Sequence, residues 1–180
     1  MVTVSSHIEI SDKGIILNGA HIECPDAALN TIYRKYIGDY PKFFKMDPLC
    51  KLGFIGAELL LRDVPIDTKN NGAVILFNRS GSLVTDRNYQ ATIGTETGYF
   101  PSPALFVYTL SNIVTGEIAI RHKIYGETSF YILDKEDDDI MEAIIKNTYL
   151  TSNPTFILTG WIEYDDDTHF NAKMKLIINE

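Results

Sequence analysis

The stretch from residue 100 to residue 133 constrains the fold more than any other part of the chain. Two prolines keep its beginning out of a helix. From Ala104 to Lys123 apolar residues recur mostly at spacings of three and four, which predicts one long helix. Gly126 is expected to end that helix in the left-handed conformation. Residues 129–133 are aromatic and apolar, which predicts a short strand covered on both faces.

Strand and helix patterns alternate along the rest of the chain. Strands are expected at residues 15–20, 72–77, 155–163 and 172–178, and helices at 27–36, 47–62, 85–93 and 135–149. Such alternation predicts an α/β sheet with right-handed crossovers. The last two strands are joined by a polar turn, so they should form an antiparallel hairpin.

Aspartates stand where several of these helices begin. Asp47, followed by a proline, is expected to cap the helix that runs to about Arg62, and that helix is apolar nearly all round, which predicts burial. Asp26 and Asp134 are the expected caps of two further helices. The run of acids that follows Asp134 would be stabilised by the positive helix end.

The long helix also carries a pattern found in a known family. In β-ketoacyl synthases, which belong to the thiolase superfamily, a helix of the type T-L-x-N-x-x-x-G-x-I-A leads to a Gly-Pro turn and to the strand that ends in the catalytic cysteine. The matching residues here are Thr109, Leu110, Asn112, Gly116, Ile118 and Ala119, with Gly126 at the turn. This part of the chain therefore resembles the ketosynthase segment that precedes the nucleophile.

The resemblance implies a fold. It is similar to a single thiolase-like half-domain, an α/β unit with a five-stranded mixed sheet, four strands parallel and one antiparallel, and helices on both faces. It covers roughly residues 15–164, and residues 1–180 are expected to form one domain. Full ketosynthases duplicate this half, and the chain resembles only the amino-terminal copy.

The nucleophile of the family has no counterpart in this sequence. It should fall between Leu133 and Lys135, where the chain reads Leu-Asp-Lys. Cys24 and Cys50 belong to other elements and have neither metal nor redox spacing. The two catalytic histidines of the family come from its second half. We therefore expect no catalytic, cofactor-binding or metal-binding residue, and no active ketosynthase (a 3-oxoacyl-ACP synthase, which is an acyltransferase) in this chain by itself.

The composition limits the possible binding partners of the protein and its cellular compartment. The net charge of −8 argues against nucleic acid or an anionic membrane surface as a partner. No apolar run approaches membrane-spanning length, and the first residues lack the apolar core of a secretory signal. These features predict a cytoplasmic protein without membrane insertion.

The first functional hypothesis is a non-catalytic, dimerising or accessory subunit in acyl chain synthesis of the fatty-acid or polyketide type. In the family, the strand before the cysteine pairs across a dimer axis. The residues at that position are Thr128, Ser129, Phe130, Tyr131 and Ile132. The expected partner is a second copy of the chain or a full-length ketosynthase, because an exposed aromatic edge is a template for strand pairing.

Two alternatives remain open. One is a small module that binds an acyl chain or an acyl carrier protein, with Phe100, Phe106, Tyr108 and Tyr131 as the acyl contacts; the competing interpretation is that these aromatics are core residues. The other is an unrelated enzyme on the same half-fold, for which only scattered acids and Ser80 or Ser82 are available.

Overall fold

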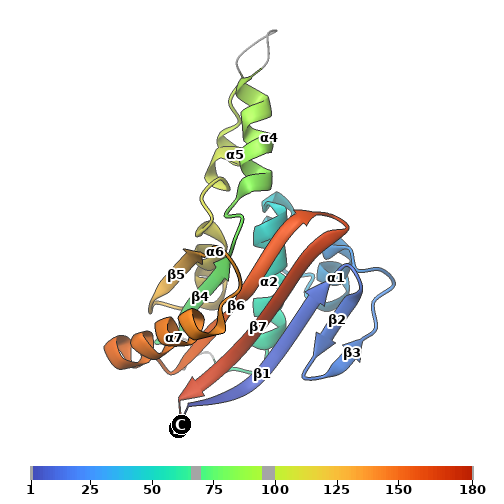
Figure 1. The fold of residues 1–180 in the computed structure, drawn as a ribbon. Coiled ribbons are helices and arrows are strands. Elements are labelled where there is room, and N and C mark those ends of the chain that lie inside the picture. Colours follow the sequence, from blue (N-terminus) through green and yellow to red (C-terminus); the bar gives the residue numbers. More distant parts are fainter. Residues whose placement is uncertain (1, 66–69, 95–99, 180) are drawn as a thin grey trace.

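A computed structural model of the chain describes residues 2–65, 70–94 and 100–179, and its centre is a single mixed sheet (Figure 1). The sheet has seven strands in the order β3-β2-β1-β7-β6-β4-β5. The expected α/β architecture is confirmed, but the expected five strands are wrong. The strands are β1 (Val2–Ser11), β2 (Gly14–Leu17), β3 (Ala20–Ile22), β4 (Ala73–Asn78), β5 (Thr128–Ile132), β6 (Phe156–Asp166) and β7 (His169–Asn179).

The two additional strands come from the beginning of the chain. Residues 15–20 were expected to be the first strand of the main sheet, but β1 lies before them, and β2 and β3 extend the sheet beyond β1 as antiparallel strands. Strand β4 is parallel to both β5 and β6, and β7 is antiparallel to both β6 and β1. Within the five strands β5-β4-β6-β7-β1, four therefore run in one direction and β7 runs against them, as expected.

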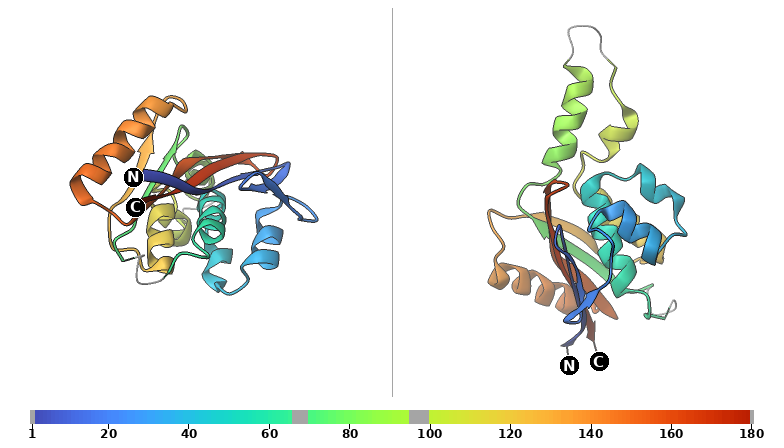
Figure 2. Two further views of the ribbon diagram at one scale, coloured as in Figure 1. Left: turned by 90° about the horizontal axis from the view of Figure 1, so that it is seen from below. Right: turned by 90° about the vertical axis from the view of Figure 1, so that its right-hand side faces the viewer.

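Helices cover both faces of the sheet, but unequally (Figure 2). Helices α1 (Leu29–Tyr36), α2 (Pro48–Leu60) and α6 (Ile113–His122) lie on one face, next to the short 3₁₀ helix η1 (Pro41–Lys45), and enclose the larger apolar core. Helix α7 (Asp138–Ser152) lies on the other face over a smaller core. Helix α4 (Leu83–Ile93) and helix α5 (Pro103–Val107) project from the body, and we call this pair the arm (Figure 1).

Helix α2 is buried as its sequence predicts. Asp47 caps it by accepting a hydrogen bond from the amide of Cys50 at 3.0 Å. A methyl group at Gly53 would lie 2.6 Å from Cγ2 of Val114 on α6, and one at Gly56 would lie 2.4 Å from the sulfur of Met174 on β7. These glycines let α2 approach both α6 and the sheet.

The long helix expected at residues 104–123 is broken into α5 and α6. Thr109 donates its hydroxyl to the carbonyl of Phe106 at 2.7 Å, and the carbonyl of Thr109 accepts the hydroxyl of Ser82. Such side-chain bonds to the main chain compete with the helical ladder. As a result, Leu110 is 53% exposed instead of lying on an apolar helix face.

Three predicted helix boundaries are also wrong. Lys123, at φ 55°, ends α6 in the left-handed conformation in place of Gly126. Gly126 instead allows a close approach, since a Cβ there would lie 2.3 Å from the carbonyl oxygen of Gly72. Asp137 caps α7 in place of Asp134, and Asp26 accepts only from the amide of Ala28, so α1 has no side-chain cap.

No helix in the described ranges is long and apolar enough to cross a membrane. The sequence also predicts a flexible connection at residues 94–98, of which residues 95–98 lie outside the described residues. Glu142 and Lys146 are exposed on α7.

A charged cluster joins α2 to α6. Arg121 donates to Glu58 at 2.9 and 3.3 Å and to Asp39 at 2.7 Å, and Nε2 of His122 lies 2.9 Å from Glu58 without the geometry of a hydrogen bond. Burial raises the pKa of Glu58, but its contacts with His122 and Arg121 outweigh burial and lower that pKa to about 2. The carboxylate is therefore stabilised more in the folded chain than in the unfolded one.

We predict that Glu58→Gln lowers the free energy of unfolding at neutral pH by roughly 1–3 kcal/mol, because Arg121 and His122 lose their anionic partner. The folded-state pKa is depressed, so this contribution is present above pH 4.5 and disappears as the pH falls toward about 2. Urea unfolding of both proteins between pH 7 and pH 3 measures the difference. Asp39→Asn, whose carboxylate is 66% exposed, is the control and should change stability much less. A gap between wild type and Glu58→Gln that does not narrow on acidification would contradict this account.

Candidate functional site

Strand β5 forms one edge of the sheet and is the strand that the sequence assigned to dimer pairing. It pairs in parallel with β4, from Val74 opposite Thr128 to Asn78 opposite Ile132. It is the last strand in the sheet order, so among the described strands no neighbour covers its other side. An uncovered edge presents main-chain donors and acceptors to an approaching chain.

The side chains of β5 are only partly covered, in contrast to the prediction of a strand buried on both faces. Phe130 packs against the larger core, and Tyr131 stacks on Phe77 at 5.4 Å in the smaller core. Thr128 and Ile132 are exposed, the latter by 59%. An edge position explains the difference, because a buried strand needs neighbours on both sides and β5 has one.

The place expected for the nucleophile follows β5 directly. The amide of Leu133 donates to the carbonyl of Asn78 at 2.9 Å, which extends the pairing by one residue, and Asp134 and Lys135 are exposed. Cys50 is buried in α2, where burial raises the pKa of its thiol well above the usual value. Such a thiol stays protonated and is a poor nucleophile.

We predict that incubation with an acyl-thioester leaves Cys50 and the residues at the end of β5 unmodified. No thiol stands at the end of β5, and the Cys50 thiol is both buried and protonated at neutral pH, whereas Cys24 is half-buried. Mass spectrometry of the chain and of its peptides measures this directly, and Leu133→Cys provides a test of whether a thiol at that place would react. An adduct on the wild-type chain, mapped to Cys50 or to residues 133–135, would contradict the prediction.

Polar groups hold the turn that follows β4 at the same end of the sheet. The side chain of Asn78 is buried. Its Nδ2 donates to the main-chain carbonyl of Gly81 at 2.8 Å, and its Oδ1 accepts from the main-chain amide of Gly81 at 3.0 Å. Glu163, on β6, accepts from the amides of Arg79 and Ser80 at 2.9 and 3.2 Å and from the hydroxyl of Ser80. Each of these donors has an acceptor, so the turn links β4 to β6, and we call this set of hydrogen bonds the clasp.

We predict that Asn78→Ala destabilises the chain by roughly 1–3 kcal/mol, because the amide and carbonyl of Gly81 would be left buried without their partner. Chemical denaturation measures the loss. Asn88→Ala, at an exposed position on α4, should leave stability within about 0.5 kcal/mol of wild type. Equal effects of the two substitutions would show that the clasp contributes nothing.

Ser82 joins the arm to the break before α6. Its hydroxyl donates to the carbonyl of Thr109 and lies 3.2 Å from a carboxylate oxygen of Asp86. Thr85 in the arm donates to Asp47 at 2.7 Å, which ties α4 to the beginning of α2. Burial raises the pKa of Asp47, and the Thr85 bond opposes that effect.

The serine-based enzyme hypothesis gains no support from these contacts. The hydroxyls of Ser80 and Ser82 are both engaged as donors, and neither has a hydrogen bond to a histidine among the described residues.

The described part of the chain also contains no group of three or more histidine, cysteine or acidic side chains that could hold a metal ion. The acidic turn between β6 and β7 is closed by Asp166, whose pKa is lowered to about 2 by hydrogen bonds from Thr168 and His169.

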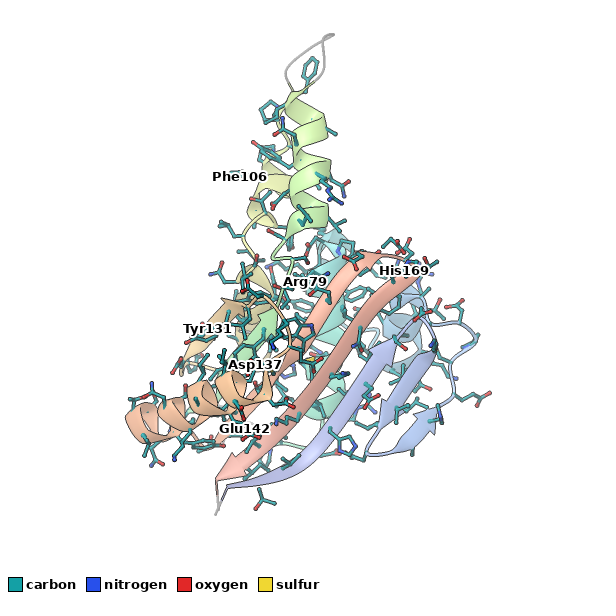
Figure 3. The ribbon with its side chains drawn as sticks, viewed as in Figure 1. Arg79, Phe106, Tyr131, Asp137, Glu142 and His169 are labelled. Carbon is teal, nitrogen blue, oxygen red and sulfur yellow. The ribbon has the colours of Figure 1, made fainter. Side chains whose placement is uncertain are left out.

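The four aromatic residues proposed as acyl contacts lie in separate places, and Figure 3 shows two of them, Phe106 on the arm and Tyr131 on β5. Tyr108 is buried in the larger core, where burial raises the pKa of its hydroxyl, and Tyr131 belongs to the smaller core on the other face. Phe106 contacts Tyr89 within the arm, with ring centres 5.5 Å apart, and Phe100 is 78% exposed. The structure therefore gives them no common lining.

Sequence reasoning missed the exposure of Leu83, Val107 and Leu110. These three side chains, like Phe106 on α5 and Ile132 on β5, are exposed by 41% or more. Ile132 and Ser111 lie beside each other, since both would be 3.2 Å from a Cβ at Gly81. The signal was the Thr-Leu-Ser-Asn sequence inside the expected helix, because hydroxyl and amide side chains favour a helix break.

Comparisons with known proteins agree with this architecture. No protein-family model and no curated protein matches the chain. Several solved structures match it over 99% of its length. One titled the ishigamide ketosynthase/chain length factor has a TM-score of 0.77 and 16% identity, and the chain covers 62% of it. A ketosynthase (ApeO) in complex with its chain length factor (ApeC) from Xenorhabdus doucetiae has a TM-score of 0.63 and 13% identity, with 79% of the matched chain covered.

The chain has the thiolase-like fold of the ketosynthases. A third structure, titled a type II polyketide synthase acyl-carrier protein in complex with its ketosynthase, matches with a TM-score of 0.64 and 12% identity. The chain spans 62% of the matched chain there, as it does in the ishigamide protein. The predicted likeness to part of a ketosynthase is thus confirmed at the level of the fold.

Proposed function

We propose that the protein is a non-catalytic subunit that pairs with a ketosynthase in acyl chain synthesis of the fatty-acid or polyketide type. The observation that carries the proposal is the open edge of β5, with the exposed side chain of Ile132 at its end. Strand pairing supplies main-chain hydrogen bonds, and burial of this apolar side chain adds affinity.

The absence of a nucleophile at Leu133–Lys135 supports an accessory role in place of a catalytic one. Two of the similar structures are titled as a ketosynthase with a chain length factor, and one as a ketosynthase with an acyl-carrier protein. These titles support a ketosynthase as the partner and an acyl carrier protein as a further component of the same assembly. A homodimer through the same edge is the second arrangement that the open strand permits.

We predict that Ile132→Lys abolishes pairing while leaving the fold intact. The substitution places an ammonium group at the end of the proposed edge, where it would be buried without a partner. The measurement is recovery of ketosynthase from the producing cell with tagged wild-type and variant chains as bait, read by mass spectrometry. Val4→Lys is the matched control, because Val4 is 52% exposed on β1, which is four strands away from β5 in the sheet.

The expected result is ketosynthase with the wild-type and Val4→Lys baits and none with Ile132→Lys. Light scattering of the purified 20.3 kDa chain separates the two arrangements, because a homodimer doubles the mass and loses that doubling in Ile132→Lys. A monomeric chain that recovers no ketosynthase, or recovery unaffected by Ile132→Lys, would overturn the proposal.

A further inference from the structure

A cavity lies at the opposite end of the sheet from the arm. It has a volume of about 540 Å³ and lies between the end of α2 and the ends of β1, β6 and β7 that are farthest from the arm. This volume is within the range of pockets that hold small molecules. None of its lining residues belongs to β5 or to the arm, so it is separate from the proposed partner edge.

The walls of the cavity are apolar and firmly packed. Leu59 and Leu60 come from the last turn of α2, Phe156 begins β6, and Leu176 lies near the end of β7. These side chains are between 2% and 6% exposed, so they belong to the larger core and hold fixed positions. They provide an apolar surface for the body of a ligand.

A bulge in β1 adds hydroxyl groups to these walls. The register between β1 and β7 shifts between Val4 and Ser6, which leaves Ser5 as the extra residue. As a result Ser5 and Ser6 both line this cavity, whereas Val4 lines a groove beside α7 on the other face. Bulges redirect side chains in this way and are frequent next to binding sites.

Ser6 also breaks the pattern of its strand. Side chains two apart point to one face, and the residues that follow Ser6 on that face are Ile8 and Ile10, which are 1% and 0% exposed. An apolar residue is expected at the next such position, but the chain has a hydroxyl there. A local break of this kind, next to a cavity with apolar walls, is typical of a functional site.

The charge of the lining limits the ligand. Among the described residues of the lining, Asp63 is the one that carries a charge, and none is a lysine or an arginine. A carboxylate or phosphate ligand would meet repulsion there, which the net charge of −8 would increase. A protonated amine would instead be attracted to Asp63 while its apolar body contacted the leucines.

We propose that this cavity binds a cationic amphiphile, with the apolar body against Leu59, Leu60 and Phe156 and the ammonium head toward Asp63 and the hydroxyls of the bulge. The inference does not depend on the pairing of β5, because the two sites share no residue.

The test uses three probes with one chain length and different heads: decylamine, decanol and decanoate, each below the concentration at which it forms micelles. Isothermal titration at pH 7 keeps the amine protonated and the carboxylate ionised. The expected result is one decylamine bound per chain, at least tenfold more tightly than decanoate, with decanol between them. Decanoate that binds as tightly as decylamine would overturn the proposal.

Variants separate the cavity from general attraction to an acidic protein. Asp63→Asn should reduce the preference for decylamine over decanol at least fivefold, whereas Asp165→Asn, an exposed acid near the end of β6, should leave it unchanged. Ser6→Phe should fill the cavity and weaken all binding at least tenfold, and Thr3→Phe, exposed on the same strand, should not.

A measurement on the wild-type chain keeps the proposal testable if Ser6→Phe fails to fold. A photoreactive diazirine analogue of decylamine should label peptides that contain Ser5 and Ser6 or residues 59–63. Labelling confined to other parts of the chain, or binding equal in wild type and a folded Ser6→Phe, would show that this cavity is not the site.

Discussion

The close seating of α2 against the sheet is the constraint on which the rest of the structure depends. A methyl group at Gly53 or Gly56 would lie 2.6 Å or less from Val114 or Met174, so glycine sets the distance at which α6 and β7 pack on this helix. The end of α2 carries Glu58 to the charged cluster of α6, and its beginning carries Asp47 to Thr85 of the arm. One buried helix thereby positions α6, the arm and the core face of the sheet.

That arrangement explains why β5 is left open. Helix α6 lies over β4 and β5 on one face, and the smaller core beneath α7 holds Tyr131 on the other, so both faces of the edge strand are supported while its outer side is not. Fixed support lets an edge strand keep its shape without a neighbour, which a flexible segment could not do. Ile132, at the end of this edge, is exposed as well, so an approaching partner would meet main-chain groups and an apolar side chain together.

The sequence predicted the elements that depend on local pattern and missed those that depend on distant contacts. The sequence of residues 47–62 predicted the position of α2 closely, because an aspartate and a proline that favour a helix start are followed there by an apolar run. The single helix predicted across residues 104–123 was wrong. Ser82 lies 27 residues before Thr109 and donates a hydrogen bond to its carbonyl, and no local sequence pattern shows such a distant contact. The buried environment expected for β5 was wrong for a related reason: aromatic composition does not show whether a strand has one neighbour or two.

The two candidate sites show the same limit of prediction from sequence. The resemblance directed attention to the end of β5, and the structure adds the exposed side chain of Leu110, which is left in solvent because the helix breaks at residues 108–112. The break that Ser6 makes in the alternation of β1 did not by itself mark the cavity at the other end, because a polar residue near the beginning of a strand reads as ordinary until the structure shows that it lines a cavity. A hydroxyl on the core side of a strand is costly to bury unless something hydrogen-bonds to it. The half-exposed position of Ser6 beside an open cavity is the arrangement that avoids this cost, since water or a ligand can reach the hydroxyl there.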